Sequence, residues 1–123
     1  MRRMLVFAVC VCGLVAAGAG RAEAHGISVT RISVRNQRSR WGACSATGAI
    51  TLNWRLVLVP EFVREYVMLH ELMHRRELNH SARFWRHVHA VCPRHQEARQ
   101  WLLSEGQQLF TGVAGSGECE ETR

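Results

Sequence analysis

The feature that most constrains this chain is the run Val67–His74, which contains two histidines and a glutamate. His70 and His74 are four positions apart, so on a helix their side chains lie one above the other on one face. Two imidazoles at that spacing can bind a single Zn²⁺ at roughly 2.0–2.1 Å. Glu71 follows the first histidine directly, which places its carboxylate within reach of a metal-bound water. The pattern His-Glu-x-x-His therefore predicts a helix that carries the metal site of a zinc hydrolase.

A third ligand is expected from the segment that follows this helix. His80 lies six residues beyond His74, in a short polar stretch where the chain has to turn back. Three protein ligands would leave the fourth position of the ion open for water, as in catalytic zinc sites. Glu77 is a weaker alternative ligand because it lies nearly a full helical turn beyond His74. The predicted site consists of His70, His74 and His80 as metal ligands and Glu71 as the catalytic carboxylate.

An exposed helix with two solvated histidines would show the same five-residue pattern, so the neighbours of the histidines matter. Most of them are apolar, which indicates that the helix is buried. A buried helix seldom carries two histidines and a glutamate that nothing uses, because burying polar groups without partners is costly. The metal-binding interpretation is therefore favoured. The apolar neighbours are Phe62, Val63, Tyr66, Val67, Leu69, Leu72 and Met73.

The length of 123 residues and the hydrophobic content of 47% fit one small domain with a packed core. We assign this domain to residues 25–110. The tail, residues 111–123, is rich in Gly, Ser and Glu and is expected to be disordered. The net charge of +6 favours a solvated basic surface. The alternative is attraction to nucleic acid or to an anionic surface.

Residues 1–24 allow two interpretations. Two arginines precede an apolar run that ends in small residues at Ala24, which is the outline of a secretory signal. The run is short and contains glycine, so no stable membrane span is expected. The second interpretation takes the segment as the remnant of an upstream domain helix, whose last turn is followed by a capping glycine, Gly26.

The remaining pattern predicts an α+β fold. Alternating apolar residues predict strands at residues 27–34 and 49–55, which we expect to pair as a small antiparallel sheet. Pro60 suits the first turn of the helix with the metal motif, which is expected to run to Leu78. Ser81 is expected to cap a second helix. A third helix is expected over residues 94–110.

Several motifs in order along the chain resemble one known family. Residues 26–103 are similar to the YgjP-like metallopeptidase-domain family, which is related to the SprT-like and WLM zinc peptidases. The motifs that carry the resemblance are Arg40-Trp41-Gly42-Ala43-Cys44-Ser45, Leu52-Asn53-Trp54-Arg55-Leu56, His70-Glu71-Leu72-Met73-His74, Asn79-His80-Ser81 with Phe84-Trp85, and Cys92-Pro93.

This resemblance implies a minimal zincin-like domain, in which a short sheet precedes the His-Glu-x-x-His helix and two further helices. It implies that His70, His74 and His80 bind Zn²⁺ and that Glu71 is the catalytic carboxylate. It also implies a peptide or protein substrate and a cytoplasmic location, whereas a true signal in residues 1–24 would make the protein secreted or periplasmic. Position 77 holds Glu where the metzincin pattern needs a turn glycine, so the metzincin label is not transferred.

The resulting hypothesis is a zinc-dependent metallopeptidase, in which a zinc-bound water attacks the peptide bond and Glu71 serves as general base. One alternative is a zinc hydrolase acting on a phosphoanhydride or another anionic substrate. Another is a nucleic-acid-associated binding module. Its phosphate contacts would come from Arg31, Arg35, Arg38 and Arg40. No sequence pattern specifies an oligomeric state.

Substrate-binding groups are also suggested by the sequence. Residues 49–55 could offer a strand edge to an extended peptide. Arg40, Trp41 and Asn53 are candidates for contacts with substrate or with a developing oxyanion. For Trp41, as for Trp54, packing in the core is the favoured interpretation.

Overall fold

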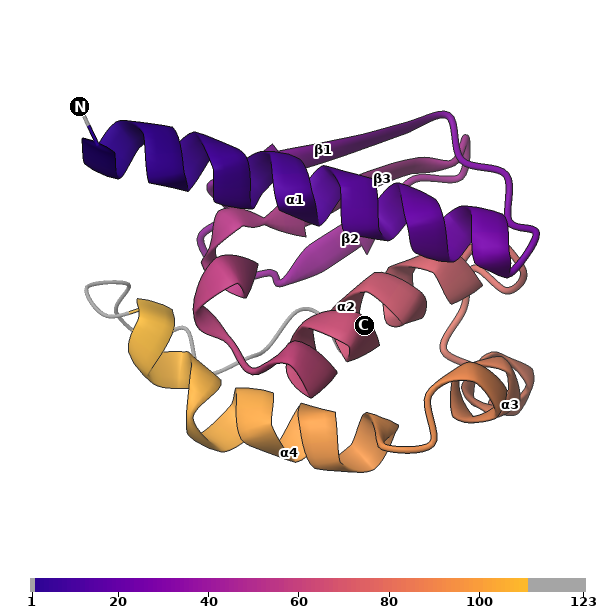
Figure 1. The fold of residues 1–123 in the computed structure, drawn as a ribbon. Coiled ribbons are helices and arrows are strands. Elements are labelled where there is room, and N and C mark those ends of the chain that lie inside the picture. Colours follow the sequence, from indigo (N-terminus) through magenta and orange to yellow (C-terminus); the bar gives the residue numbers. More distant parts are fainter. Residues whose placement is uncertain (1, 111–123) are drawn as a thin grey trace.

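The computed structural model describes residues 2–110, with side chains from residue 12 onward, and shows a small α+β fold (Figure 1). The predicted fold class is therefore confirmed. The predicted disordered tail, residues 111–123, lies outside the described residues. The elements in chain order are α1 Arg2–Ala24, β1 Arg31–Arg35, β2 Gly42–Cys44, β3 Ala49–Asn53, the 3-10 helix η1 Trp54–Leu58, α2 Glu61–Met73, α3 Ala82–Val91, α4 His95–Ser104 and the 3-10 helix η2 Gly106–Phe110.

The sheet has three strands in the order β1-β3-β2, and it is mixed. β1 pairs with β3 in parallel, with Ile32 opposite Ile50, so the antiparallel pairing predicted for residues 27–34 and 49–55 is wrong. The antiparallel partner of β3 is β2, a strand that the sequence analysis did not assign. β2 and β3 are joined by a tight turn in which the Gly48 amide donates to the Ser45 carbonyl. Gly48 has a φ of +96°, a conformation that glycine adopts without a steric penalty.

One face of the sheet is covered by helices. A Cβ placed on Gly18 of α1 would lie 3.4 Å from Ile32 and 3.8 Å from Leu52, so α1 packs on the face to which these side chains point. Gly42 is the register partner of Leu52 and therefore faces the same way. A Cβ on Gly42 would meet Glu71 of α2. The helices α1 and α2 thus share one face, and the alternation of strand side chains sends Arg31 and Arg35 to the other face.

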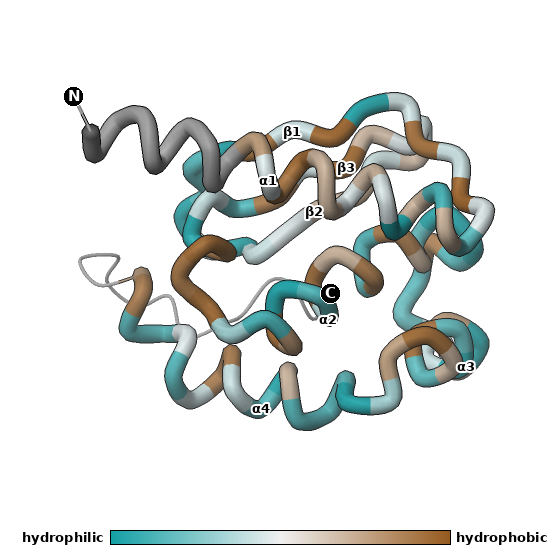
Figure 2. Tube along the Cα trace, in the orientation of Figure 1, coloured by the Kyte–Doolittle hydropathy of each residue, from teal (hydrophilic) through white to brown (hydrophobic). Residues whose placement is uncertain are grey.

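The core forms between this covered face and the helices. The central helix α2 is buried along most of its length, as the apolar residues around its histidines predicted. The short helix η1 adds Leu56, which is fully buried. Figure 2 shows residues 56–59 as a hydrophobic run next to the start of α2. On the opposite side of α2, Phe84, Val88, Ala98 and Leu102 from α3 and α4 complete the core.

The helix boundaries differ moderately from those predicted. α2 ends at Met73, earlier than the predicted Leu78, and a turn follows it. The predicted cap of α3 is confirmed, because the Ser81 hydroxyl accepts a hydrogen bond from the Phe84 amide. The third helix ends at Ser104, and η2 completes the stretch that was predicted to be helical up to residue 110.

The glycine cap expected after residue 24 is present. Gly26 has a φ of +65°, its amide donates to the Glu23 carbonyl, and the Ile27 amide donates to the Ala22 carbonyl. These two bonds form a Schellman motif, and both Ala22 and Ile27 are buried. Whether residues 1–24 also serve as a targeting signal stays a prediction. None of the helices within the described residues is long and apolar enough to cross a membrane.

Candidate metal centre

The structure brings together the three histidines that the sequence singled out. His70 and His74 lie in the last turn and at the C-cap of α2, and His80 lies in the loop before α3. One ring nitrogen from each histidine lies within 4.8 Å of those of the other two. His70 and His74 are buried, whereas His80 is half-buried. This is the one cluster among the described residues in which at least three His, Cys, Asp or Glu side chains could hold a metal ion.

The distances within the cluster fit a tetrahedral ion. The Nε2 atom of His80 is 3.1 Å from Nε2 of His74 and 3.2 Å from Nε2 of His70. Two nitrogens bound to tetrahedral zinc at about 2.05 Å would lie roughly 3.3 Å apart. The donor set therefore fits Zn²⁺ in both chemistry and spacing.

The ring orientation of each histidine has a structural cause. The Nδ1 atom of His74 is 3.0 Å from the carbonyl oxygen of Glu77, which can only accept, so Nδ1 carries the proton and Nε2 presents its lone pair. The Nδ1 atom of His70 is 3.2 Å from the Tyr66 hydroxyl. The ring of His80 instead packs between aromatic rings, edge-on to Phe84 at 5.0 Å and stacked on Trp85 at 6.0 Å.

Burial and positive neighbours favour the neutral form of His80. Burial, the nearby His74 and the Arg99 guanidinium together lower the pKa of His80 from 6.5 to about 4. The ring is therefore neutral at physiological pH, which is the state in which an imidazole binds a metal.

Glu71, the predicted catalytic carboxylate, lies against the backbone of β2. Its side chain is buried, with an exposed fraction of 3%. A Cβ added to Gly42 would lie 2.8 Å from Cγ of Glu71, which is closer than real Cβ atoms approach a neighbour, and 3.1 Å from its Oε2 atom. The absence of a side chain at position 42 therefore makes room for the carboxylate. Sequence reasoning missed this role of Gly42.

A cleft of about 240 Å³ opens beside the histidines. Glu71 and His74 line it on the side of α2, and β2 lines it on the side of the sheet. Arg40 stands at the same cleft, just before β2. Burial and the neighbouring Glu71 raise the pKa of the Cys44 thiol, which also lines the cleft, to about 11, so this thiol stays protonated.

Two of the suggested substrate-binding residues instead have structural roles. The Asn53 amide donates to the carbonyl oxygens of Gln37 and Arg40, and its oxygen accepts from the Arg55 amide, so Asn53 holds the loop before β2 in place. Trp41 is fully buried, with its ring edge-on to Phe110 at 4.9 Å, which confirms core packing. Trp54 is only half-buried, so the prediction of core packing holds less well for that residue.

The strand predicted to offer its edge to a peptide is not an edge strand. β3 is the central strand and is paired on both sides. The edge strand that lines the cleft is β2. Glu77, the alternative ligand, has its carboxylate 3.6 Å from the Arg83 guanidinium, and its contact with the histidine cluster is made by the backbone.

The likeness of this chain to known proteins agrees with these features. Residues 17–105 match the family described as YgjP-like, metallopeptidase domain. Among solved structures, the chain is similar to the crystal structure of the metallopeptidase zymogen of Pyrococcus abyssi abylysin, with 25% sequence identity and a TM-score of 0.64. That similarity covers 79% of this chain and 95% of the other. No curated protein sequence matches the chain.

Proposed function

Because the chain belongs to the YgjP-like metallopeptidase-domain family, we propose that it is a zinc-dependent peptidase with His70, His74 and His80 as metal ligands and Glu71 as general base. The observation that carries the proposal is the convergence of three imidazole nitrogens next to a buried carboxylate at the wall of a cleft. The family supports a metal-dependent peptidase, and the chemistry of three imidazoles favours zinc among the divalent metals.

The three histidines would hold the ion, which when bound would supply a Lewis acid that activates water and polarises the substrate carbonyl. The carboxylate of Glu71 would accept a proton from the attacking water and later pass it to the leaving amine. Its close fit against Gly42 fixes the position of the carboxylate before substrate binds. A fixed base is effective because little reorganisation is needed in the transition state.

The substrate would bind in an extended conformation along β2. β2 is an edge strand of three residues and lines the cleft. The outer side of an edge strand presents backbone N–H and C=O groups that can pair with a peptide. This pairing would place the scissile bond between β2 and α2, where Glu71 lies.

The proposal is tested with the substitution Glu71→Gln. The variant is expected to bind one equivalent of zinc and to lose peptide hydrolysis by about 10²–10⁴-fold, the usual contribution of a general base. Zinc content is measured by elemental analysis, and hydrolysis is measured with a fluorogenic peptide library. The matched control is Glu65→Gln, on the same helix, which removes a carboxylate that pairs with Arg21 at the surface.

The proposal fails if Glu71→Gln retains the activity of the wild type. It also fails if the zinc-loaded wild type releases phosphate from a nucleotide panel and cleaves no peptide, since that result would assign the site to phosphoanhydride hydrolysis.

A further inference from the structure

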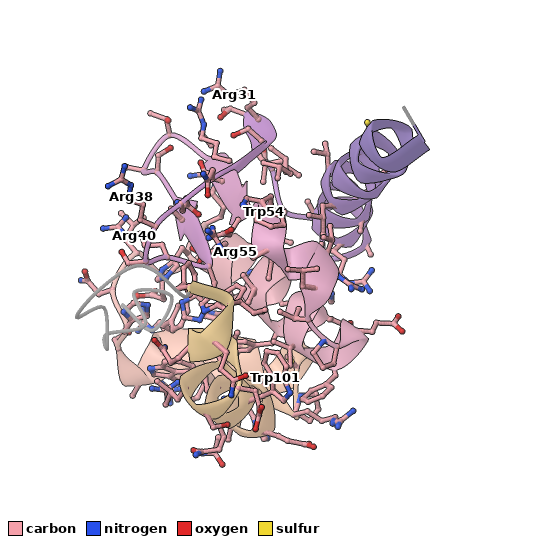
Figure 3. All side chains as sticks on the ribbon, turned by 90° about the vertical axis from the view of Figure 1, so that its left-hand side faces the viewer. Arg31, Arg38, Arg40, Trp54, Arg55 and Trp101 are labelled. Carbon is pink, nitrogen blue, oxygen red and sulfur yellow. The ribbon has the colours of Figure 1, made fainter. Side chains whose placement is uncertain are left out.

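Four arginines, which we call the basic face, lie on β1 and on the loop before β2: Arg31, Arg35, Arg38 and Arg40. All four side chains are exposed. Arg31 and Arg35 alternate with Ile32 and Val34 in β1, so they point away from α1. In Figure 3, Arg38 and Arg40 lie on the left of the view and Arg31 lies at the top, whereas α1 lies on the right.

The segment that carries the basic face has no acidic residue of its own. Residues 24–60 contain five arginines and no aspartate or glutamate. The ion pairs formed between described residues involve Arg21, Arg83 and Arg94, all outside this segment. A patch that is rich in one charge creates a field that attracts a partner of opposite sign.

The basic face is continuous with the cleft. Arg40 lines the cleft next to Gly42 and Glu71, and it belongs to the same loop as Arg38. The loop is held rigidly, because the Arg40 carbonyl accepts a hydrogen bond of 2.7 Å from the buried Asn53 amide. An extended chain that leaves the cleft past Arg40 would therefore meet further positive charges.

We propose that the basic face binds an acidic segment of the polypeptide substrate, next to the bond that is cleaved. This inference rests on the proposed peptidase function and names the class of its substrates. β1 places Arg31 and Arg35 about 13 Å apart at 3.3 Å per residue, a spacing that side chains four residues apart in an extended peptide can match. Guanidinium groups bind carboxylates well because two N–H donors can meet two oxygens.

A nucleic acid is the less suitable occupant of this surface. Proteins that bind single strands combine basic residues with exposed aromatic rings on which the bases stack. Residues 31–40 contain no aromatic residue, and the adjacent Trp41 is fully buried. The half-buried Trp54 donates a hydrogen bond to Asn36, and the Arg55 guanidinium already lies over its ring at 5.0 Å. The continuity with a cleft that fits a peptide therefore favours an acidic polypeptide.

The test measures binding and cleavage separately. Two fluorescent peptides that differ only in four Glu→Gln replacements on one side of the cleavage site are titrated against zinc-loaded protein with the Glu71→Gln substitution. The acidic peptide is expected to bind about tenfold more tightly, with the difference shrinking as salt rises from about 50 to 200 mM. The double substitution Arg38→Gln with Arg40→Gln is expected to remove this preference, whereas Arg86→Gln, on the exposed side of α3, preserves it.

Equal binding of the two peptides overturns the inference, and so does a preference that survives the double substitution. An oligonucleotide that binds more tightly than the acidic peptide through the same arginines also overturns it, in favour of a nucleic-acid partner. Because binding is measured on the inactive variant, these outcomes do not depend on catalysis. A wild-type protein that binds the acidic peptide and cleaves no peptide would instead contradict the proposed function alone.

Discussion

At the scale of single residues, the predicted site depends on the groups that contact each predicted metal ligand and the predicted catalytic carboxylate. The Glu77 carbonyl fixes the tautomer of His74, and the aromatic rings of Phe84 and Trp85 fix the plane of His80. Gly42 is the least obvious of these supporting residues, because it supports the site by having no side chain. The carboxylate of Glu71 occupies the space that a Cβ would take.

Substituting Gly42→Ala is therefore expected to displace Glu71 and to lower kcat about 10–100-fold, as small displacements of catalytic groups do. The three histidines belong to other segments, so the zinc content is expected to stay at one equivalent. Steady-state kinetics and metal analysis of the same preparation check both expectations. The control is Gly20→Ala in α1, where a Cβ would meet nothing within 4 Å. Wild-type kcat in Gly42→Ala would show that the close contact does not position the carboxylate.

At the scale of elements, the loop before β2 joins the sheet to the cleft. Its shape is set from β3, because the Asn53 amide binds two of its carbonyl oxygens. Arg55 adds a hydrogen bond from its Nη1 atom to the Gln37 carbonyl. The loop in turn positions Arg40 at the cleft.

Substituting Asn53→Ala would leave the Arg40 carbonyl without this donor and the Arg55 amide without its acceptor, whereas the Gln37 carbonyl would still accept from Arg55. We expect the free energy of unfolding to fall by about 1–3 kcal/mol, the usual cost of leaving such groups unsatisfied. We also expect KM for an acidic peptide to rise, because Arg40 loses its fixed position. Urea denaturation and steady-state kinetics measure the two effects. Thr51→Ala, a neighbouring half-buried position in β3, is the control, and an equal loss of stability in both variants would contradict this role of Asn53.

At the scale of the whole molecule, the histidine cluster brings together two segments of the chain. His70 and His74 belong to α2, whereas His80 belongs to the loop that leads into α3. In the metal-free protein, the neutral ring of His80 lies in a partly buried site next to positive groups. The stability of the metal-free protein is therefore expected to depend on pH.

The sign of this dependence follows from the pKa values. Burial and positive neighbours lower the pKa of His80 from 6.5 to about 4, and burial and His89 lower the pKa of His95. Between about pH 4 and pH 6.5 the unfolded chain binds more protons than the folded one. Stability is therefore greatest above pH 6.5 and falls toward pH 4. Urea denaturation of chelator-treated protein at several pH values tests this. In the variant His80→Asn, the free energy of unfolding is expected to depend less steeply on pH. A stability that rises on acidification would contradict the lowered pKa of His80.

The sequence by itself determined the features that depend on residues close together in the chain. The spacing of His70 and His74 places both on one face of a helix, whatever surrounds it. Ser81 caps α3 through its own hydroxyl, and Gly26 caps α1 through its own backbone. The proximity of His80 to the pair could also be anticipated, because only a short turn separates it from α2. The metal-binding and catalytic roles of these residues stay predictions.

Only the tertiary structure decided which segments pair in the sheet and which face of the sheet stays open. Alternating side chains show that residues form a strand, but they carry no information about the direction of its partner. The antiparallel partner of β3 proved to be the short strand β2, and β1 pairs with β3 in parallel on the other side. That arrangement, set by contacts between residues far apart in the sequence, places Gly42 against Glu71 and leaves the basic face exposed.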